Sequence, residues 1–189
     1  MGENKPEFEQ EEANVRQTSV GNISAQRVEI HQGYATHVQA SHDVTIRQGG
    51  AKEVRAQSVT IRQGVGVTVD ADNVQMVQGA AGLVRASDAH VGPGSSSAAV
   101  VADTVKLEQS ATKFVLARDS VEMDQSGTGI LVGQHITAKD CGAVLMIANS
   151  VEGNVSVVMD RQTAIGFGAA FGAALGLMLA VFGILRRKK

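Results

Sequence analysis

The feature that most constrains the fold is a phrase that occurs twice in close succession. The chain reads DVTIRQG at 43–49 and SVTIRQG at 58–64. Each copy belongs to a series of apolar pairs, split by a single intervening residue, that recurs with a short and nearly constant period. The members are Ala13/Val15, Val28/Ile30, Val44/Ile46, Val59/Ile61, Val74/Met76, Ala89/Val91, Val105/Leu107, Val121/Met123, Ile136/Ala138 and Val151/Gly153. A fixed short period of this kind indicates a chain of stacked structural repeats.

A second series of apolar pairs lies midway between members of the first. It comprises Ile23/Ala25, Val38/Ala40, Val54/Ala56, Val69/Ala71, Val84/Ala86, Val100/Ala102, Val115/Ala117, Leu131/Gly133 and Met146/Ala148. The alternation in both series predicts β-strands. A glutamine follows the first pair in most repeats, at Gln17, Gln32, Gln48, Gln63, Gln78, Gln109 and Gln125, and glycine or serine usually comes next. These residues are typical of the turn that ends a strand.

Two short strands and two turns per period predict an all-β fold, a single-stranded β-solenoid (β-helix) over residues 13–160. We expect about ten rungs of about 15–16 residues, where a rung is one turn of the coil. At about 4.8 Å per rung the rod would be about 45 Å long. Valine and isoleucine would fill its interior, and the glutamines would stack as an amide ladder. An antiparallel meander has the same alternation and is the alternative.

The N-terminal segment, residues 1–12, is acidic. It contains five glutamates and one lysine, so its formal charge is 1 − 5 = −4. It has no apolar region of the kind that a signal peptide requires. We therefore expect an acidic disordered arm or a polar cap over the first rung.

The C-terminal segment, residues 161–189, has the composition of a membrane anchor. From Ala164 to Leu185 the chain carries no charge, and as a helix these 22 residues span about 33 Å, enough for a hydrocarbon core of about 30 Å. We predict one transmembrane α-helix; a buried core helix is the alternative. Its small residues Gly168, Gly172 and Gly176 share one face, as in packed membrane helices. A basic tail of Arg186, Arg187, Lys188 and Lys189 follows.

Two arguments about membrane orientation disagree. The basic tail favours a cytoplasmic C-terminus by the positive-inside rule, which would place the rod outside. However, we expect no N-terminal export signal, and an anchor at the C-terminus would emerge after the rod has been made. We expect a single-pass membrane protein, in contact with lipid, whose rod lies on the cytoplasmic side.

The outward position of the second strand changes character along the chain. It is polar in the early repeats (Ser24, Gln39, Arg55, Asp70, Arg85) and apolar in the later ones (Val101, Leu116, Val132, Ile147). We call the last four residues the apolar stripe. Monomers rarely expose such a patch, so we expect self-association to cover it. Lipid headgroups or a local loop are alternative covers.

No feature of the chain indicates an enzyme, a cofactor or a metal. The histidines (His31, His37, His42, His90 and His135) lack ligand spacing. The segment GPGSSSAA, residues 92–99, lacks the lysine of a phosphate loop and is expected to form a flexible surface loop. Arg47 and Arg62 stack one rung apart and could hold an anion or share nearby carboxylates, but the strip is too short for nucleic acid. Cys141 has no partner for a disulfide and is expected to pack in a turn.

The phrases SVGNISAQRVEIHQG (19–33) and VEGNV (151–155) resemble the rung phrases of bactofilins, polymer-forming bacterial cytoskeletal proteins. The resemblance covers roughly residues 13–155. It implies a right-handed β-helix that assembles end to end at membranes without nucleotide. This chain differs in its shorter period, its C-terminal anchor and its lateral apolar stripe. The anchor and the acidic arm would each obstruct one end of the rod, which argues against end-to-end assembly.

Together these features predict a membrane-anchored β-solenoid that self-associates into a homo-oligomeric scaffold or polymer at the membrane surface. The apolar stripe and the glycine face of the helix are the candidate contacts. The alternative is a membrane-tethered binding module whose ladder surface is displayed to a protein, a glycan or an anionic ligand.

Overall fold

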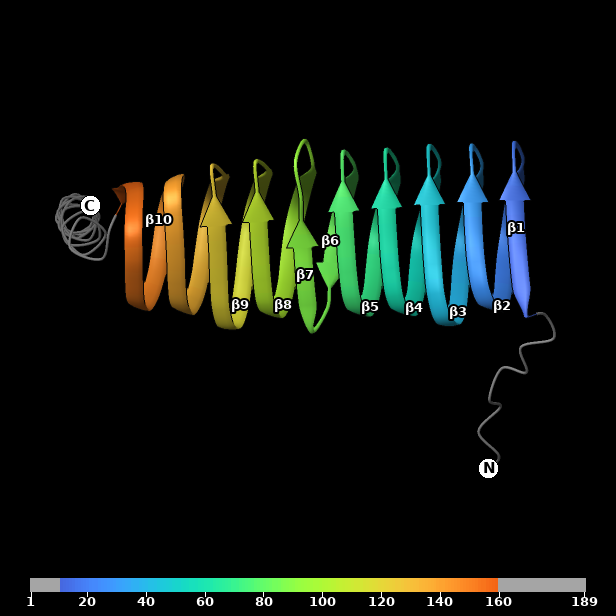
Figure 1. Ribbon diagram of the computed structural model, residues 1–189, viewed down its shortest axis with the longest axis horizontal. Coiled ribbons are helices and arrows are strands. Elements are labelled where there is room, and N and C mark those ends of the chain that lie inside the picture. Colours follow the sequence, from blue (N-terminus) through green and yellow to red (C-terminus); the bar gives the residue numbers. More distant parts are fainter. Residues whose placement is uncertain (1–10, 160–189) are drawn as a thin grey trace, which may run out of the picture.

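The computed structural model describes residues 11–159, and within this range the protein is a parallel β-solenoid (Figure 1). The coil completes about 9 turns, one fewer than the repeats suggested, and the described residues contain no helix. The prediction of a β-solenoid is confirmed. The acidic arm up to residue 10, the predicted transmembrane helix with Gly168, Gly172 and Gly176, and the basic tail lie outside the described residues.

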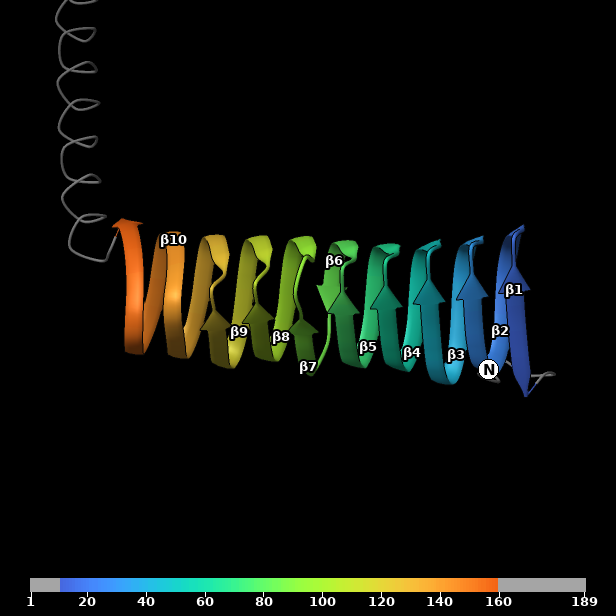
Figure 2. The ribbon, with the colours of Figure 1, turned by 45° about the horizontal axis from the view of Figure 1, so that its top comes forward.

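The coil consists of ten strands that pair with their neighbours in parallel. They are β1 (Glu12–Arg16), β2 (Ser19–His31), β3 (Tyr34–Arg47), β4 (Gly50–Arg62), β5 (Val65–Val77), β6 (Ala80–Arg85), β7 (Asp88–Val91), β8 (Ser96–Glu108), β9 (Ala111–Asp124) and β10 (Gly127–Met159). β6 and β7 share one rung, and the 33 residues of β10 form the last rungs. Figures 1 and 2 show the rungs side by side, with β1 at one end of the rod and β10 at the other.

The rung formed by β3 shows why this sequence coils. Its buried residues are Ala35, Val38, Ala40, Val44 and Ile46. Two consecutive residues that are not buried, Thr36 and His37, separate the first two of these, so strict alternation fails there and the strand bends. A second bend lies at Ser41–Asp43, where the pairing of β3 with β4 shifts register. These two bends, together with the turn at Gln48 that ends the strand, close this rung on itself.

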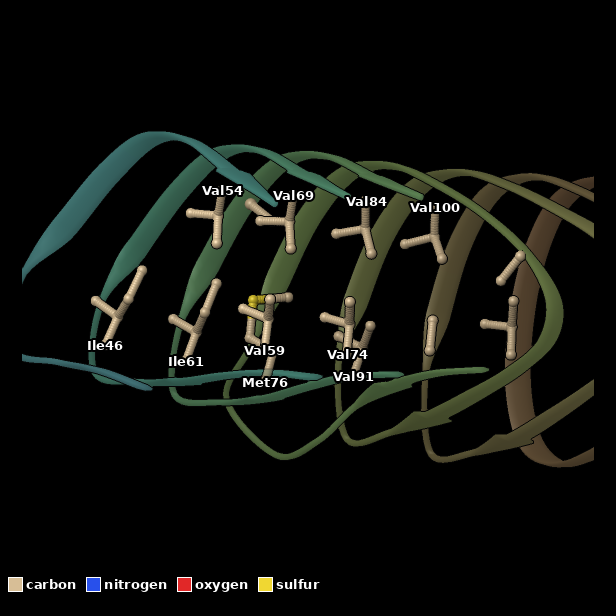
Figure 3. Packing of buried hydrophobic residues seen from close by; sticks show 14 of the residues in the cluster. Ile46, Val54, Val59, Ile61, Val69, Val74, Met76, Val84, Val91 and Val100 are labelled. Carbon is tan, nitrogen blue, oxygen red and sulfur yellow. The ribbon is translucent and has the colours of Figure 1, made fainter. Parts of the chain in front are cut away.

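The core consists of identical positions stacked from rung to rung. Ile30, Ile46, Ile61 and Met76 are paired in register and at most 1% exposed. Figure 3 shows the three later members of this column beneath a second column, Val54, Val69, Val84 and Val100. Each predicted inward pair up to Ile136/Ala138 has at least one buried member, although Ala56, Ala71 and Ala86 are only half-buried. In the last two pairs neither member is buried: Met146 and Ala148 are half-buried, and Val151 is 43% exposed because it belongs to the last described rung and no further described rung packs on it.

The glutamine of each turn adopts a left-handed backbone, with φ between 44° and 53°. Their side-chain amides form the predicted ladder: Nε2 of each residue in the series Gln17, Gln32, Gln48, Gln63 donates to Oε1 of the next, ending at Gln78, over 3.1–3.3 Å. A second, shorter ladder joins Gln109 to Gln125 at 3.1 Å. Left-handed geometry costs a residue with a Cβ roughly 1–2 kcal/mol, and the amide hydrogen bonds offset this cost.

The loss of stability on replacing Gln63 should therefore depend on which residue replaces it. Gln63→Ala keeps the backbone cost but loses both ladder bonds, and we expect a destabilisation of about 1–2 kcal/mol. Gln63→Gly also loses the bonds but removes the left-handed strain, so its loss should be smaller by about 1 kcal/mol. Urea unfolding measures both. An alanine variant as stable as the glycine variant would show that the turn is not strained.

The ladder is interrupted at the segment that was expected to be a flexible loop. Gly92–Ser95 instead form a short turn within the stack, and β8 begins at Ser96. Gly94 takes the left-handed position, with φ 69°, and its N–H donates to the carbonyl of Gln109 in the turn of the following rung. The expectation of a loop was wrong for residues 96–99, which pair as a strand with β6 and β9; residues 92–95 form the turn, because glycine and serine can satisfy the same turn geometry as Gln-Gly.

Candidate functional site

The outward column that contains the apolar stripe is continuous through the rod. Arg55, Asp70, Arg85, Val101, Leu116 and Val132 are paired in register on successive rungs. Ile147 follows Val132 at the same position of the next repeat. The column is therefore polar up to Arg85 and apolar beyond it, in the positions that the sequence predicted.

Most of the stripe is open to solvent. Val101 is 39% exposed, Leu116 49% and Ile147 55%, whereas Val132 is half-buried. Their strand neighbours Val100, Val115 and Leu131 are at most 2% exposed. The strand in these rungs is therefore apolar on both of its faces, and only the inner face is covered within the described part of the chain.

A second apolar column, which sequence reasoning missed, lies beside the stripe. It occupies the position two residues earlier, on the same outward side of the strand. Its early members are polar (Asn22, His37, Glu53, Thr68), and its later members are Leu83, Ala99, Phe114, Ile130 and, one step further, Leu145. Phe114 is 53% exposed. The signal was present in the sequence as the same change from polar to apolar at a fixed position in the period.

We call the stripe and this second column together, from Ala99 to Ile147, the apolar face. On one side it continues into a shallow groove of about 780 Å³. Phe114, Ile130 and Val144 line this groove, and Gly127 and Gly142 contribute to it. Val144 is itself 51% exposed. The apolar surface is thus wider than the stripe alone.

The opposite side of the apolar face is bordered by charged residues. A hollow of about 530 Å³ is lined by Val101 and Leu116 and by Asp70, Arg85, Asp103 and Arg118. Arg118 and Asp103 form an ion pair at 3.0 Å. An apolar strip with a polar rim is the usual anatomy of a protein–protein contact.

A separate ionic network lies on the strand after the second bend. Lys106 Nζ is 3.0 Å from Glu108, and His90 Nε2 is 3.2 Å from the same carboxylate. The hydrogen bond with Glu108 raises the pKa of Lys106, and the hydrogen bonds from Lys106 and His90 lower the pKa of Glu108. These side chains are about one-third exposed or more, so the network contributes little to stability.

Cys141 is buried, with its thiol 3.1 Å from the carbonyl of Lys139. Within residues 11–159 no three histidine, cysteine, aspartate or glutamate side chains are grouped as metal ligands. These residues also form no helix that is long and apolar enough to cross a membrane.

Comparisons with protein-family models, with curated proteins and with solved structures find no match for this chain. The β-helix that the bactofilin resemblance implied is present, but no family match supports membership of that family. The protein is a β-helix repeat protein.

Proposed function

We propose that this protein is a membrane-anchored scaffold whose rods associate side by side through the apolar face. The observation that carries the proposal is the change of both outward columns from polar to apolar in the C-terminal half of the rod. Phe114, Leu116 and Ile147 are each about half exposed there. Burial of such side chains contributes roughly 25 cal/mol per Å² of apolar surface removed from water.

The size of the apolar face explains why an anchor would help. Four rungs at about 4.8 Å give a length of about 20 Å, and two columns give a width of about 14 Å. The face therefore covers about 300 Å² of each rod, compared with about 800 Å² per partner in a standard stable complex. Rods free in solution would associate weakly. Rods held on one membrane by the segment Ala164–Leu185 would meet at a higher effective concentration, and the same contact would then suffice.

The test is to place charge on the apolar face without disturbing the fold. Leu116→Asp with Ile147→Asp adds two carboxylates to a column in which Asp70 already occurs naturally. The matched control, Ser24→Asp with Gln39→Asp, adds the same charge to the polar half of that column. Full-length protein is reconstituted into lipid vesicles, and energy transfer between donor-labelled and acceptor-labelled copies measures association on the membrane. We expect the first variant to dissociate at least roughly tenfold more readily than the wild type and the control to behave as the wild type does.

An energy-transfer efficiency that is the same for both variants and the wild type would contradict the proposal. In that outcome the rod would remain a display surface, and the membrane-tethered binding module becomes the better description. Circular dichroism of each variant checks that the rod is still folded.

A further inference from the structure

A column of basic residues runs along the N-terminal half of the rod, on a different side from the apolar face. Arg16, His31, Arg47 and Arg62 are paired in register on four successive rungs. The next position is Val77, and the later members of the column are Glu108, Asp124 and Lys139. We call the first four residues the basic column. Within this column, positive charge is therefore concentrated on the first rungs of the rod.

Arg47 and Arg62 lack an ionic partner among the described residues, although both are exposed. Three arginines in other columns are paired: Arg27 with Asp43, Arg55 with Glu53, and Arg118 with Asp103. The strand positions two residues before Arg47 and Arg62 carry Thr45 and Thr60, which are neutral. Like charges placed opposite each other on neighbouring strands are destabilising, so the column favours an anion that would compensate it.

Only the first rungs offer a nearby carboxylate. Glu29 lies beside the column and is 3.8 Å from His31. The hollow there, about 400 Å³ in volume, is lined by Arg16, Gln17, Glu29, His31 and Gln32. Glu29 therefore faces the histidine, and Arg47 and Arg62 remain without a counter-charge from the described part of the rod.

We propose that the acidic N-terminal arm of the same chain, residues 1–10, docks on the basic column. The arm contains Glu3, Glu7 and Glu9 against Lys5, a net charge of 1 − 3 = −2. These glutamates all occupy odd-numbered positions, so an extended arm presents the three carboxylates on one side, with Lys5 as the single unfavourable charge. Pro6 has no N–H, so the arm docks through side chains instead of adding a complete strand.

The length of the arm fits this path. β1 begins at Glu12, and the carbonyl of Glu11 already accepts a hydrogen bond from Arg27, which fixes the start of the arm. The step along β1 from Glu12 to Arg16 is about 13 Å, and the three rungs from Arg16 to Arg62 add about 14 Å in the perpendicular direction. The far end of the column is thus about 20 Å from the start of the arm, whereas ten extended residues reach about 33 Å.

Zero-length carbodiimide cross-linking tests the contact, because it joins carboxylates only to amines that touch them. Arg47→Lys and Arg62→Lys keep the charge of the column and supply the amines. In full-length protein we expect cross-links from the glutamates of the arm to positions 47 and 62. The yield of these cross-links should be roughly tenfold higher than the yield of cross-links to Lys52 and Lys113. A few exposed ion pairs together favour the docked position by about this factor. Lys52 and Lys113 are exposed and serve as matched controls.

Two controls accompany the cross-linking. The native pair Lys106–Glu122, at 3.9 Å, should cross-link in every sample and shows that the rod is folded. Mixing ¹⁵N-labelled with unlabelled protein distinguishes docking within a chain, which gives only like-labelled pairs, from docking between chains. Equal yields at the control lysines, mixed-label pairs as frequent as like-labelled ones, or yields unchanged in roughly 1 M salt, where exposed charges are screened, would each overturn the proposal.

Discussion

Gly49→Ala is expected to destabilise the rod by about 3 kcal/mol, because the turn has no room for a Cβ. A Cβ at this position would clash with the carbonyl oxygen of Gly33, on the preceding rung, and would lie 3.1 Å from the nitrogen of Gly33. That oxygen accepts the N–H of Gly50 at 2.9 Å. Moving either backbone would therefore break a hydrogen bond between rungs.

The matched control for this substitution is Gly127→Ala. A Cβ at Gly127 would meet no atom within 4 Å, and the backbone there is not left-handed. We expect a neutral effect or a slight stabilisation, because alanine restricts the unfolded chain more than glycine does. Urea unfolding followed by circular dichroism measures both variants. A Gly49→Ala protein as stable as Gly127→Ala would mean that neighbouring rungs can separate at the turn without cost.

The period of the sequence was sufficient to predict the coil, because one repeat cannot bury its apolar face alone and stacking is the only cover that so short a unit has. The inward positions and the ladder of glutamine amides followed directly from that register. The bends within each rung were not predictable in the same way. They occur where two consecutive residues that are not buried, such as Thr36 and His37, separate two buried residues, instead of the single residue of a regular strand. Counting apolar pairs does not detect this extra residue.

Only part of the candidate surface could be predicted from the sequence, because the bends also obscure which side chains face outward. The apolar stripe was visible because Val101 and Leu116 break an alternation with their neighbours. The second column, with Phe114, lies just after a bend, where it was not obvious whether the side chain faces inward or outward. The basic column was visible only as the pair Arg47 and Arg62. Its extension to Arg16 and His31 depends on the strand register, in which the step from one rung to the next is not constant.

Ile61→Ala is expected to cost about 3–4 kcal/mol, within the range for large-to-small substitutions in a packed core. Ile61 is 0% exposed and stacks between Ile46 and Met76 on the rungs on either side. A cavity at this position weakens two interfaces at once. In a solenoid each rung contacts only its neighbours, so the lost packing cannot be recovered elsewhere.

Val15→Ala is the comparison that isolates this nearest-neighbour effect. Val15 is buried, at 6% exposed, but belongs to β1, which pairs only with β2 among the described strands. We expect its loss to be about 1–2 kcal/mol, because fewer atoms are removed and only one interface is weakened. Amide exchange should show the opening of Val15→Ala confined to the first rung, whereas Ile61→Ala should lower protection on both sides of β4. Protection lost uniformly along the rod in both variants would instead mean that all the turns of the coil unfold as one cooperative unit.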